Sequence, residues 1–120
     1  MSGPLLIVDD EADLRESLQE YLQDHGYLVR TATNGQEALE VMSGDQVPCV
    51  VILDLIMPVM NGREVYERMQ QDARLATVPV IVSTSDPSRA PAGVPTLRKP
   101  YDLRRLLAVV QTHCTPLQAP

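Results

Sequence analysis

The sequence predicts an α/β protein built on a doubly wound, five-stranded parallel sheet, with the fourth helix shortened or missing. Short apolar runs alternate with amphipathic stretches along the 120 residues, and this alternation is typical of a parallel sheet with helices on both faces. Polar residues follow almost every apolar run, at the strand ends where such folds bind ligands. Because 120 residues fit one domain, we expect a single domain over 1–120, with a core at about 4–112 and a tail at 113–120.

Five short segments have the composition of buried or half-buried strands. The runs "PLLIV", "CVVIL" and "VPVIVST" are apolar and rich in Val and Ile, as expected for strands covered on both faces. The segments "YLVRTAT" and "VPTLR" are more polar. The expected strands are 4–8, 27–33, 49–53, 78–84 and 94–98.

Amphipathic spacing and capping residues indicate the helices. Leu14, Leu18 and Leu22 recur every four residues, which places them on one face of a helix. Asn34 and Glu37 have the spacing of a reciprocal N-terminal cap. The expected helices cover 11–24, the stretch between Asn34 and Gly44, 62–72, and a last segment after Asp102 that carries Leu103, Leu106, Leu107 and Val110.

The segment between the fourth and fifth strands is too short for a full helix. Only 85–93 remain there, and an ordinary helix has about 11 residues before its connections are counted. Asp86 and Pro87 are suited to a helix start, but Pro91 removes a donor and forces the preceding residue out of helical geometry. We therefore expect at most one turn, of α or 3₁₀ type, near 87–90.

Composition excludes several function classes. The net charge of −6 argues against a direct nucleic-acid partner. The chain has no apolar run of 18 residues and no signal-peptide pattern, so we expect no membrane association. Cys49 and Cys114 have neither CxxC nor metal-type spacing, which favours two free thiols in a reducing compartment and a cytoplasmic location.

Charged and hydroxyl side chains follow four of the five expected strands. Asp9 and Asp10 follow the first strand, Asp54 follows the third, Thr84 ends the fourth, and Lys99 follows the fifth. Because the carboxyl ends of parallel strands meet at one edge of a sheet, we expect these groups to share one pocket. Scattered surface charge would not produce this pattern.

These residue types suit phosphoryl chemistry with a divalent cation. Carboxylates that share a pocket repel each other unless a proton or a cation enters, and such oxygen ligands suit Mg²⁺. An Asp carboxylate can attack a phosphoryl group and form an aspartyl phosphate. That transfer depends on charge neutralisation and alignment, which a lysine ammonium and a threonine hydroxyl help to supply.

Four motifs together resemble the receiver domain of two-component response regulators. They are "VDDE" at 8–11, "DLIMPVMNG" at 54–62, "PVIVST" at 79–84 and "KP" at 99–100. The resemblance implies a CheY-like, flavodoxin-like fold with strand order 2-1-3-4-5. It also implies that the domain takes a phosphoryl group from a sensor histidine kinase and signals to a downstream protein or effector domain through altered contacts. It would not be an enzyme beyond self-phosphorylation and self-dephosphorylation.

The resemblance assigns a role to each site residue. Asp54 would be the phosphoacceptor and a ligand of Mg²⁺. Asp10 would bind the ion directly, Asp9 would act mainly through a water molecule, and the main-chain carbonyl of Ile56 would complete the protein ligands.

Two further residues would contact the phosphoryl group itself. Thr84 would sense it with its hydroxyl, and Lys99 would pair with it through its ammonium. The peptide bond between Lys99 and Pro100 would be cis, which is rare outside X–Pro bonds.

Two departures keep an alternative function open. Thr96 stands where the family usually has an aromatic switch residue, and the helix before it is missing. The alternative is a receiver-fold protein-interaction module whose output does not depend on phosphorylation. A phosphatase of the haloacid dehalogenase type would need a second Asp two residues after Asp54, where this chain has Ile56.

Overall fold

One parallel sheet of five strands forms the centre of the computed structural model, which describes residues 3–44 and 46–114. The strand order is β2-β1-β3-β4-β5, and all four neighbouring pairs are parallel. The elements in chain order are β1 (Leu5–Val8), α1 (Ala12–Asp24), β2 (Val29–Ala32), α2 (Gly35–Met42), β3 (Val50–Asp54), α3 (Gly62–Gln71), β4 (Val80–Thr84), η1 (Pro87–Arg89), β5 (Thr96–Arg98) and α4 (Leu103–Gln111).

The predicted fold class is confirmed, and the ends of the expected elements move by at most about two residues, the usual uncertainty of such boundaries. Asn34 caps α2 as expected, because its side-chain oxygen accepts a hydrogen bond of 2.9 Å from the Glu37 amide. Within the described part of the chain, every helix is too short or too polar to span a bilayer. The last residues of the expected tail, 115–120, lie outside the described residues.

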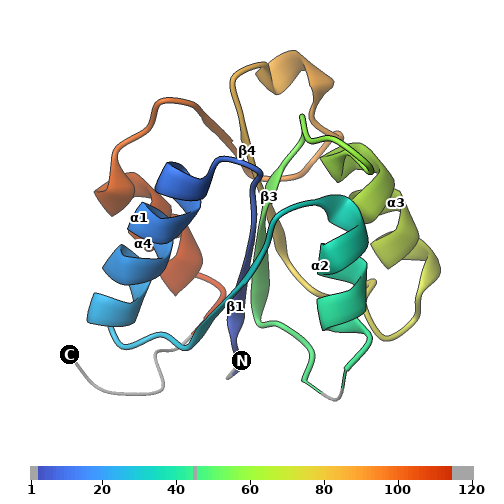
Figure 1. The fold of residues 1–120 in the computed structure, drawn as a ribbon, viewed down its shortest axis with the longest axis horizontal. Helices are drawn as coiled ribbons and strands as arrows, with labels where there is room; N and C mark the ends of the chain where they lie inside the picture. The colour runs from blue at the N-terminus through green and yellow to red at the C-terminus, as the bar shows by residue number, and fades with distance from the viewer. Residues whose placement is uncertain (1–2, 45, 115–120) are drawn as a thin grey trace.

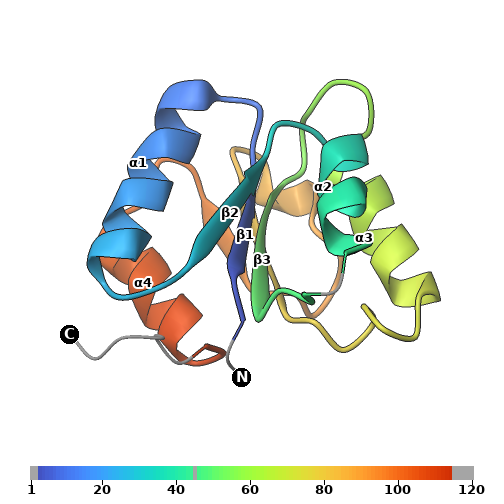
Figure 2. The same ribbon diagram turned by 60° about the horizontal axis from the view of Figure 1, so that its bottom comes forward.

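Helices α1 and α4 cover one face of the sheet, and helices α2 and α3 cover the other (Figures 1 and 2). The strand side chains alternate between these faces, as the pleat of a strand requires. Leu6 and Val8 of β1 pack toward α2 and α3, whereas Leu5 and Ile7 pack toward α1 and α4. The central strands are therefore buried on both sides, which explains their continuous apolar sequence.

A single 3₁₀ turn, η1, replaces the helix that would normally connect β4 to β5, at the top of Figure 1. The Asp86 carboxylate caps this turn by accepting a 3.2 Å hydrogen bond from the Ser88 amide. Ala90 and Val94 then pack against the core on the α2 and α3 side. The short segment therefore covers part of the face that a full helix would cover.

The expectation of two free thiols is wrong. Cys49 and Cys114 form a disulfide on the α1 and α4 side of the sheet, with a Cα–Cα distance of 5.8 Å. Both residues are buried. They are 65 residues apart in sequence, so no spacing rule could pair them, and only the fold brings the start of β3 next to the end of α4.

Gly62, the last residue of the "DLIMPVMNG" motif, is required by close packing rather than by an unusual backbone angle. A Cβ atom at this position would overlap the carbonyl oxygen of Asp54 and would lie 2.8 Å from the Cα of Leu55. The Gly62 amide donates a 3.0 Å hydrogen bond to the Leu55 carbonyl. The start of α3 is thus pressed directly onto the end of β3.

Reduction of the disulfide should lower the free energy of unfolding by about 2–4 kcal/mol, because the bond closes a long loop in the unfolded chain. Urea unfolding in oxidised and reduced buffer, with a free-thiol assay, measures the effect. The double variant Cys49→Ala/Cys114→Ala is the control and should unfold identically in both buffers. An unchanged midpoint for the wild-type protein, despite two newly titratable thiols, would contradict a stabilising role.

Gly62→Ala should lower the free energy of unfolding by about 2 kcal/mol, because the added methyl group must displace backbone. Gly44→Ala is a matched control: its Cβ would lie 3.6 Å from the Val41 carbonyl oxygen, an ordinary contact, and should change stability by less than about 0.5 kcal/mol. Thermal unfolding compares the two. Equal effects of the two substitutions would show that close packing at Gly62 is not the reason for the glycine.

Candidate functional site

The structure brings the predicted site residues together at the carboxyl edge of the sheet. Asp9 follows β1, Asp54 and Thr84 are the last residues of β3 and β4, and Lys99 follows β5. Asp9, Asp54 and Thr84 are at most 5% exposed, whereas Asp10 beside them is exposed. The site is therefore a partly buried pocket with one open acidic side.

Three carboxylates converge in this pocket. Asp9, Asp10 and Asp54 each place one carboxylate oxygen within 4.8 Å of the others. Isolated carboxylates at this spacing repel one another, so the cluster requires compensating positive charge. An all-oxygen donor set of this kind fits a hard divalent cation such as Mg²⁺.

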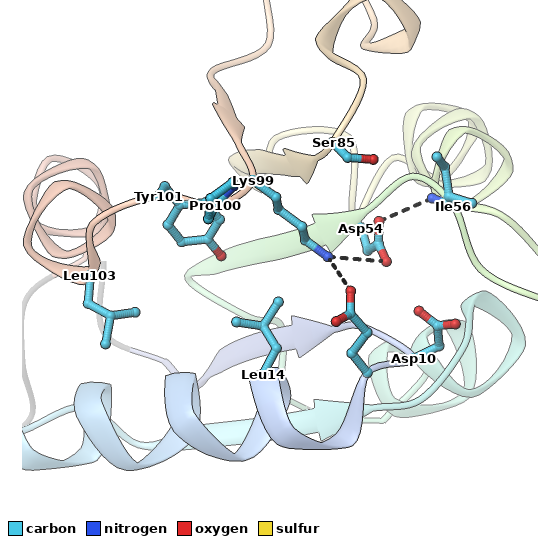
Figure 3. Close-up of a pocket in the computed structure, with 10 residues that line it drawn as sticks. Asp10, Leu14, Asp54, Ile56, Ser85, Lys99, Pro100, Tyr101 and Leu103 are labelled. Atoms are coloured by element: carbon cyan, nitrogen blue, oxygen red, sulfur yellow. Dashed lines mark hydrogen bonds and ion pairs between the residues drawn. The ribbon is translucent and has the colours of Figure 1, made fainter.

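Lys99 supplies part of the compensating charge. Its Nζ atom lies 2.9 Å from Asp9 Oδ2 and 3.3 Å from Glu11 Oε1. It also lies 3.5 Å from Asp54 Oδ2, a contact that is drawn in Figure 3. Burial alone would lower the pKa of Lys99, but its hydrogen bond to Asp9 and the nearby carboxylates outweigh burial and raise it. The lysine is therefore fully charged at neutral pH.

Asp54 is the carboxyl group whose proton affinity is most disturbed. Burial raises its pKa to about 6, against the lowering effects of the Ile56 amide and of Lys99. The Ile56 amide donates a 3.1 Å hydrogen bond to Asp54 Oδ1, while the charges of Asp9 and Asp10 raise the pKa further. The group is thus held at the end of a buried strand, in a place where its negative charge is costly without a cation.

Thr84 and Lys99 connect the ends of the two neighbouring strands. The Lys99 amide donates a 2.8 Å hydrogen bond to the Thr84 carbonyl. The Thr84 hydroxyl oxygen accepts a 3.1 Å hydrogen bond from the Asp86 amide, at the start of the loop that carries η1. The Lys99–Pro100 bond is cis, as expected. The hydroxyl of Thr84 therefore contacts the unusual loop directly.

An open cavity of about 640 Å³ adjoins the acidic cluster and extends between α1 and the start of α4 (Figure 3). Its apolar wall is formed by Leu14, Pro100, Tyr101 and Leu103. The Ser83 hydroxyl donates a 3.1 Å hydrogen bond to the Tyr101 hydroxyl oxygen, and burial raises the pKa of Tyr101. The pocket is therefore acidic at one end and apolar at the other.

The sequence-based assignment did not include Glu11 and Tyr101 among the site residues. Glu11 is an ordinary exposed residue by type, and only its position directly after the Asp pair places it near Lys99. Tyr101 lies two residues after Lys99, and its hydroxyl reaches Ser83 because the chain turns there. Both residues could have been found by their proximity in sequence to assigned residues.

The chain matches the family model for the response regulator receiver domain over residues 5–111. This chain is a response regulator receiver domain. It is 35% identical over 113 residues to response regulator MprA of Mycobacterium ulcerans, covering 90% of this chain and 48% of that protein. It is 34% identical over 123 residues to response regulator Rre1 of Synechocystis, covering 96% and 53%. The chain thus spans about half the length of these regulators.

Solved structures of the family support the assignment of the receiver fold. A putative response regulator from Chloroflexus aurantiacus is 31% identical with a TM-score of 0.85, and 93% of this chain and 97% of that chain are covered. Response regulator TrrA of Thermotoga maritima, solved in complex with Mg²⁺-BeF, is 32% identical with a TM-score of 0.79, at 93% and 98% coverage. The protein is therefore a phosphoacceptor signalling module of the response regulator family.

Without divalent cations, the receiver should lose stability as the pH rises from about 4 to about 7, by on the order of 2 kcal/mol. The folded pKa of Asp54, about 6, exceeds its ordinary value of 3.8, so the folded state binds the proton more tightly than the unfolded chain. Stabilisation by that proton is complete below the unfolded pKa and is lost as the pH passes the folded pKa.

Urea unfolding against pH in a chelating buffer measures this loss. Asp54→Asn should remove this contribution to the slope and be more stable than wild type at pH 7. Identical pH profiles for the variant and the wild type would show that Asp54 ionises in the folded state as freely as in the unfolded chain.

Proposed function

We propose that Asp54 accepts the phosphoryl group of this receiver, from a phosphohistidine of a sensor histidine kinase. The observation that carries the proposal is the buried Asp54 carboxylate at the end of β3, with Lys99 and two further carboxylates around it. An Asp54 oxygen forms the new bond to phosphorus while the bond from phosphorus to the histidine nitrogen breaks. The imidazole leaves with the electron pair, and water later hydrolyses the aspartyl phosphate.

We further propose that Mg²⁺ binds at the three carboxylates. Asp10, exposed at the mouth of the pocket, would bind the ion directly, Asp9 would act through a water molecule, and the Ile56 carbonyl would add a main-chain ligand. When bound, the ion supplies positive charge to the phosphoryl oxygens. The donor chemistry and the spacing of the carboxylates support this proposal.

Lys99 changes partners during the reaction. Its ammonium contacts Asp9 and Glu11 in this structure and lies 3.5 Å from Asp54 Oδ2. It would turn from these two partners to the phosphoryl oxygens on Asp54. The Thr84 hydroxyl has a proton to donate while its oxygen still accepts from the Asp86 amide. Movement of Thr84 toward the phosphoryl group would therefore pull on the loop at η1.

The output partner is a downstream protein or an effector domain whose contacts with the receiver change when Thr84 and the loop at η1 move. The regulators that the chain matches are about twice as long as the receiver, which supports an effector domain as one form of the partner. The complete set of site residues favours this function over an interaction module with phosphorylation-independent output.

Amide NMR spectra with Mg²⁺ and beryllofluoride, a phosphoryl mimic, test the phosphoacceptor. We expect shifts near Asp54, Thr84 and Lys99 that disappear in Asp54→Ala. A receiver that shows no Mg²⁺-dependent response to beryllofluoride would refute the proposal.

Lys99→Ala should bind Mg²⁺ as tightly as the wild type or more tightly, because the ammonium that competes for Asp9 and Asp54 is removed. The shifts around Thr84 on adding beryllofluoride should be lost, since the mimic then lacks its cationic partner. Titration calorimetry and NMR measure the two effects. Weaker Mg²⁺ binding in the variant would contradict this division of roles.

A further inference from the structure

A second, smaller cleft lies beside the phosphorylation site. It has a volume of about 190 Å³, a wall formed by Leu55 and Ile56 of the segment after β3, and a rim formed by Asn61, Arg63 and Arg89. Ile56 lines this cleft and also the larger acidic cavity. The cleft therefore lies at the same carboxyl edge of the sheet, on the side of α3 and η1.

Two guanidinium groups flank this cleft. Arg63 Nη1 donates a 3.3 Å hydrogen bond to the Arg89 carbonyl, which ties the start of α3 to η1. Arg89 Nε forms a 3.4 Å ion pair with Asp86, and the Arg89 side chain is 68% exposed. These contacts use one nitrogen of each guanidinium group, and each group has five N–H donors. Donors therefore remain for a ligand.

The surroundings of the two arginines define the chemistry of that ligand. Carboxylates match the donor fork of a guanidinium group. Exposed apolar side chains lie in the adjoining loop: Ile56 is 50% exposed and Val59 is 80% exposed. A cationic cleft beside an apolar patch fits an acidic peptide that also carries an aliphatic side chain. The net charge of −6 disfavours a nucleic acid as the occupant.

We propose that this cleft docks an acidic segment of a partner protein, with a carboxylate between Arg63 and Arg89 and an apolar side chain on Ile56 and Val59. The replacement of a helix by η1 brings Arg89 to this position, so the surface is a consequence of the short loop. The partner is recognised by charge complementarity.

This surface is also connected to the phosphorylation site, an inference that rests on the proposed function. The Ile56 amide donates to the Asp54 carboxylate, and the Asp86 amide at the start of the η1 loop donates to the Thr84 hydroxyl. A phosphoryl group on Asp54 changes both contacts. The shape of the cleft, and thus its affinity for the acidic segment, depends on the state of Asp54.

Binding of a fluorescein-labelled peptide of sequence DLDDLD, with NLNNLN as its uncharged counterpart, tests the docking surface. We expect DLDDLD to bind, to shift the amides of Ile56, Asn61 and Arg89, and to bind about tenfold more weakly to Arg63→Gln/Arg89→Gln. The matched control Arg30→Gln/Arg68→Gln has the same net charge and should change affinity by less than about twofold.

Three results would overturn the docking surface. The first is an equal loss of DLDDLD affinity in both double variants, which would indicate nonspecific charge attraction. The second is tight binding of NLNNLN. The third is binding of a single-stranded oligonucleotide through Arg63 and Arg89 while DLDDLD stays unbound.

The coupling to Asp54 is measured by repeating the peptide titration with Mg²⁺ and beryllofluoride. We expect a change in peptide affinity of about fivefold in the wild type and none in Asp54→Ala. An unchanged affinity in the wild type would overturn the role as an output surface. Failure of the phosphoacceptor role would give a separate result. Beryllofluoride would then leave the amides of Thr84 and Lys99 unshifted in spectra recorded without peptide.

Discussion

The contact between Lys99 and the buried acids Asp9 and Asp54 is the constraint on which the rest of the site depends. Two nearly buried carboxylates beside a third would be unfavourable without a cation. The lysine that follows β5 provides one, two strands away from Asp54 on β3 and three strands away from Asp9 after β1. The same contact places the ammonium within reach of Asp54. The group that stabilises the resting site is therefore the group that is suited to pair with a phosphoryl group.

The position of Asp54 depends in turn on close backbone packing behind it. Gly62 lets the start of α3 touch the end of β3, and the Ile56 amide between them is directed at the Asp54 carboxylate. Burial of Asp54 and presentation of the Ile56 backbone are thus two results of one tight loop. The apolar residues Leu55, Met57 and Met60 fix this loop in the core.

The alternation of strands and helices in the sequence was sufficient to predict a parallel sheet with helices on both faces, and the common edge of such a sheet was sufficient to predict that the site residues meet. The strand order 2-1-3-4-5 followed from the resemblance to receiver domains, and the structure has that order. Asp9, Asp54, Thr84 and Lys99 each end or follow a strand, so their meeting did not depend on loop details. The shortened connection at η1 was also predictable, since Pro91 and the available length exclude a full helix.

Other features depend on three-dimensional proximity that no local pattern contains. The disulfide joins positions that meet only when α4 packs near the start of β3. From the sequence alone, Gly62 is explained only as a residue that permits a turn into the third helix. The structure shows instead that a side chain at this position would overlap the backbone of Asp54 and Leu55. The contacts of Glu11 with Lys99 and of Tyr101 with Ser83 arise from side-chain reach across the pocket.

Val59 shows how the loop after Asp54 differs from a relaxed surface turn. Its φ of 69° lies in a backbone region that is unfavourable for β-branched residues. Val59 is also 80% exposed, so buried contacts of its side chain do not offset the strain. The buried residues Met57 and Met60 on either side hold the conformation. Strain is therefore stored in the segment that links Asp54 to the cleft at Arg63 and Arg89.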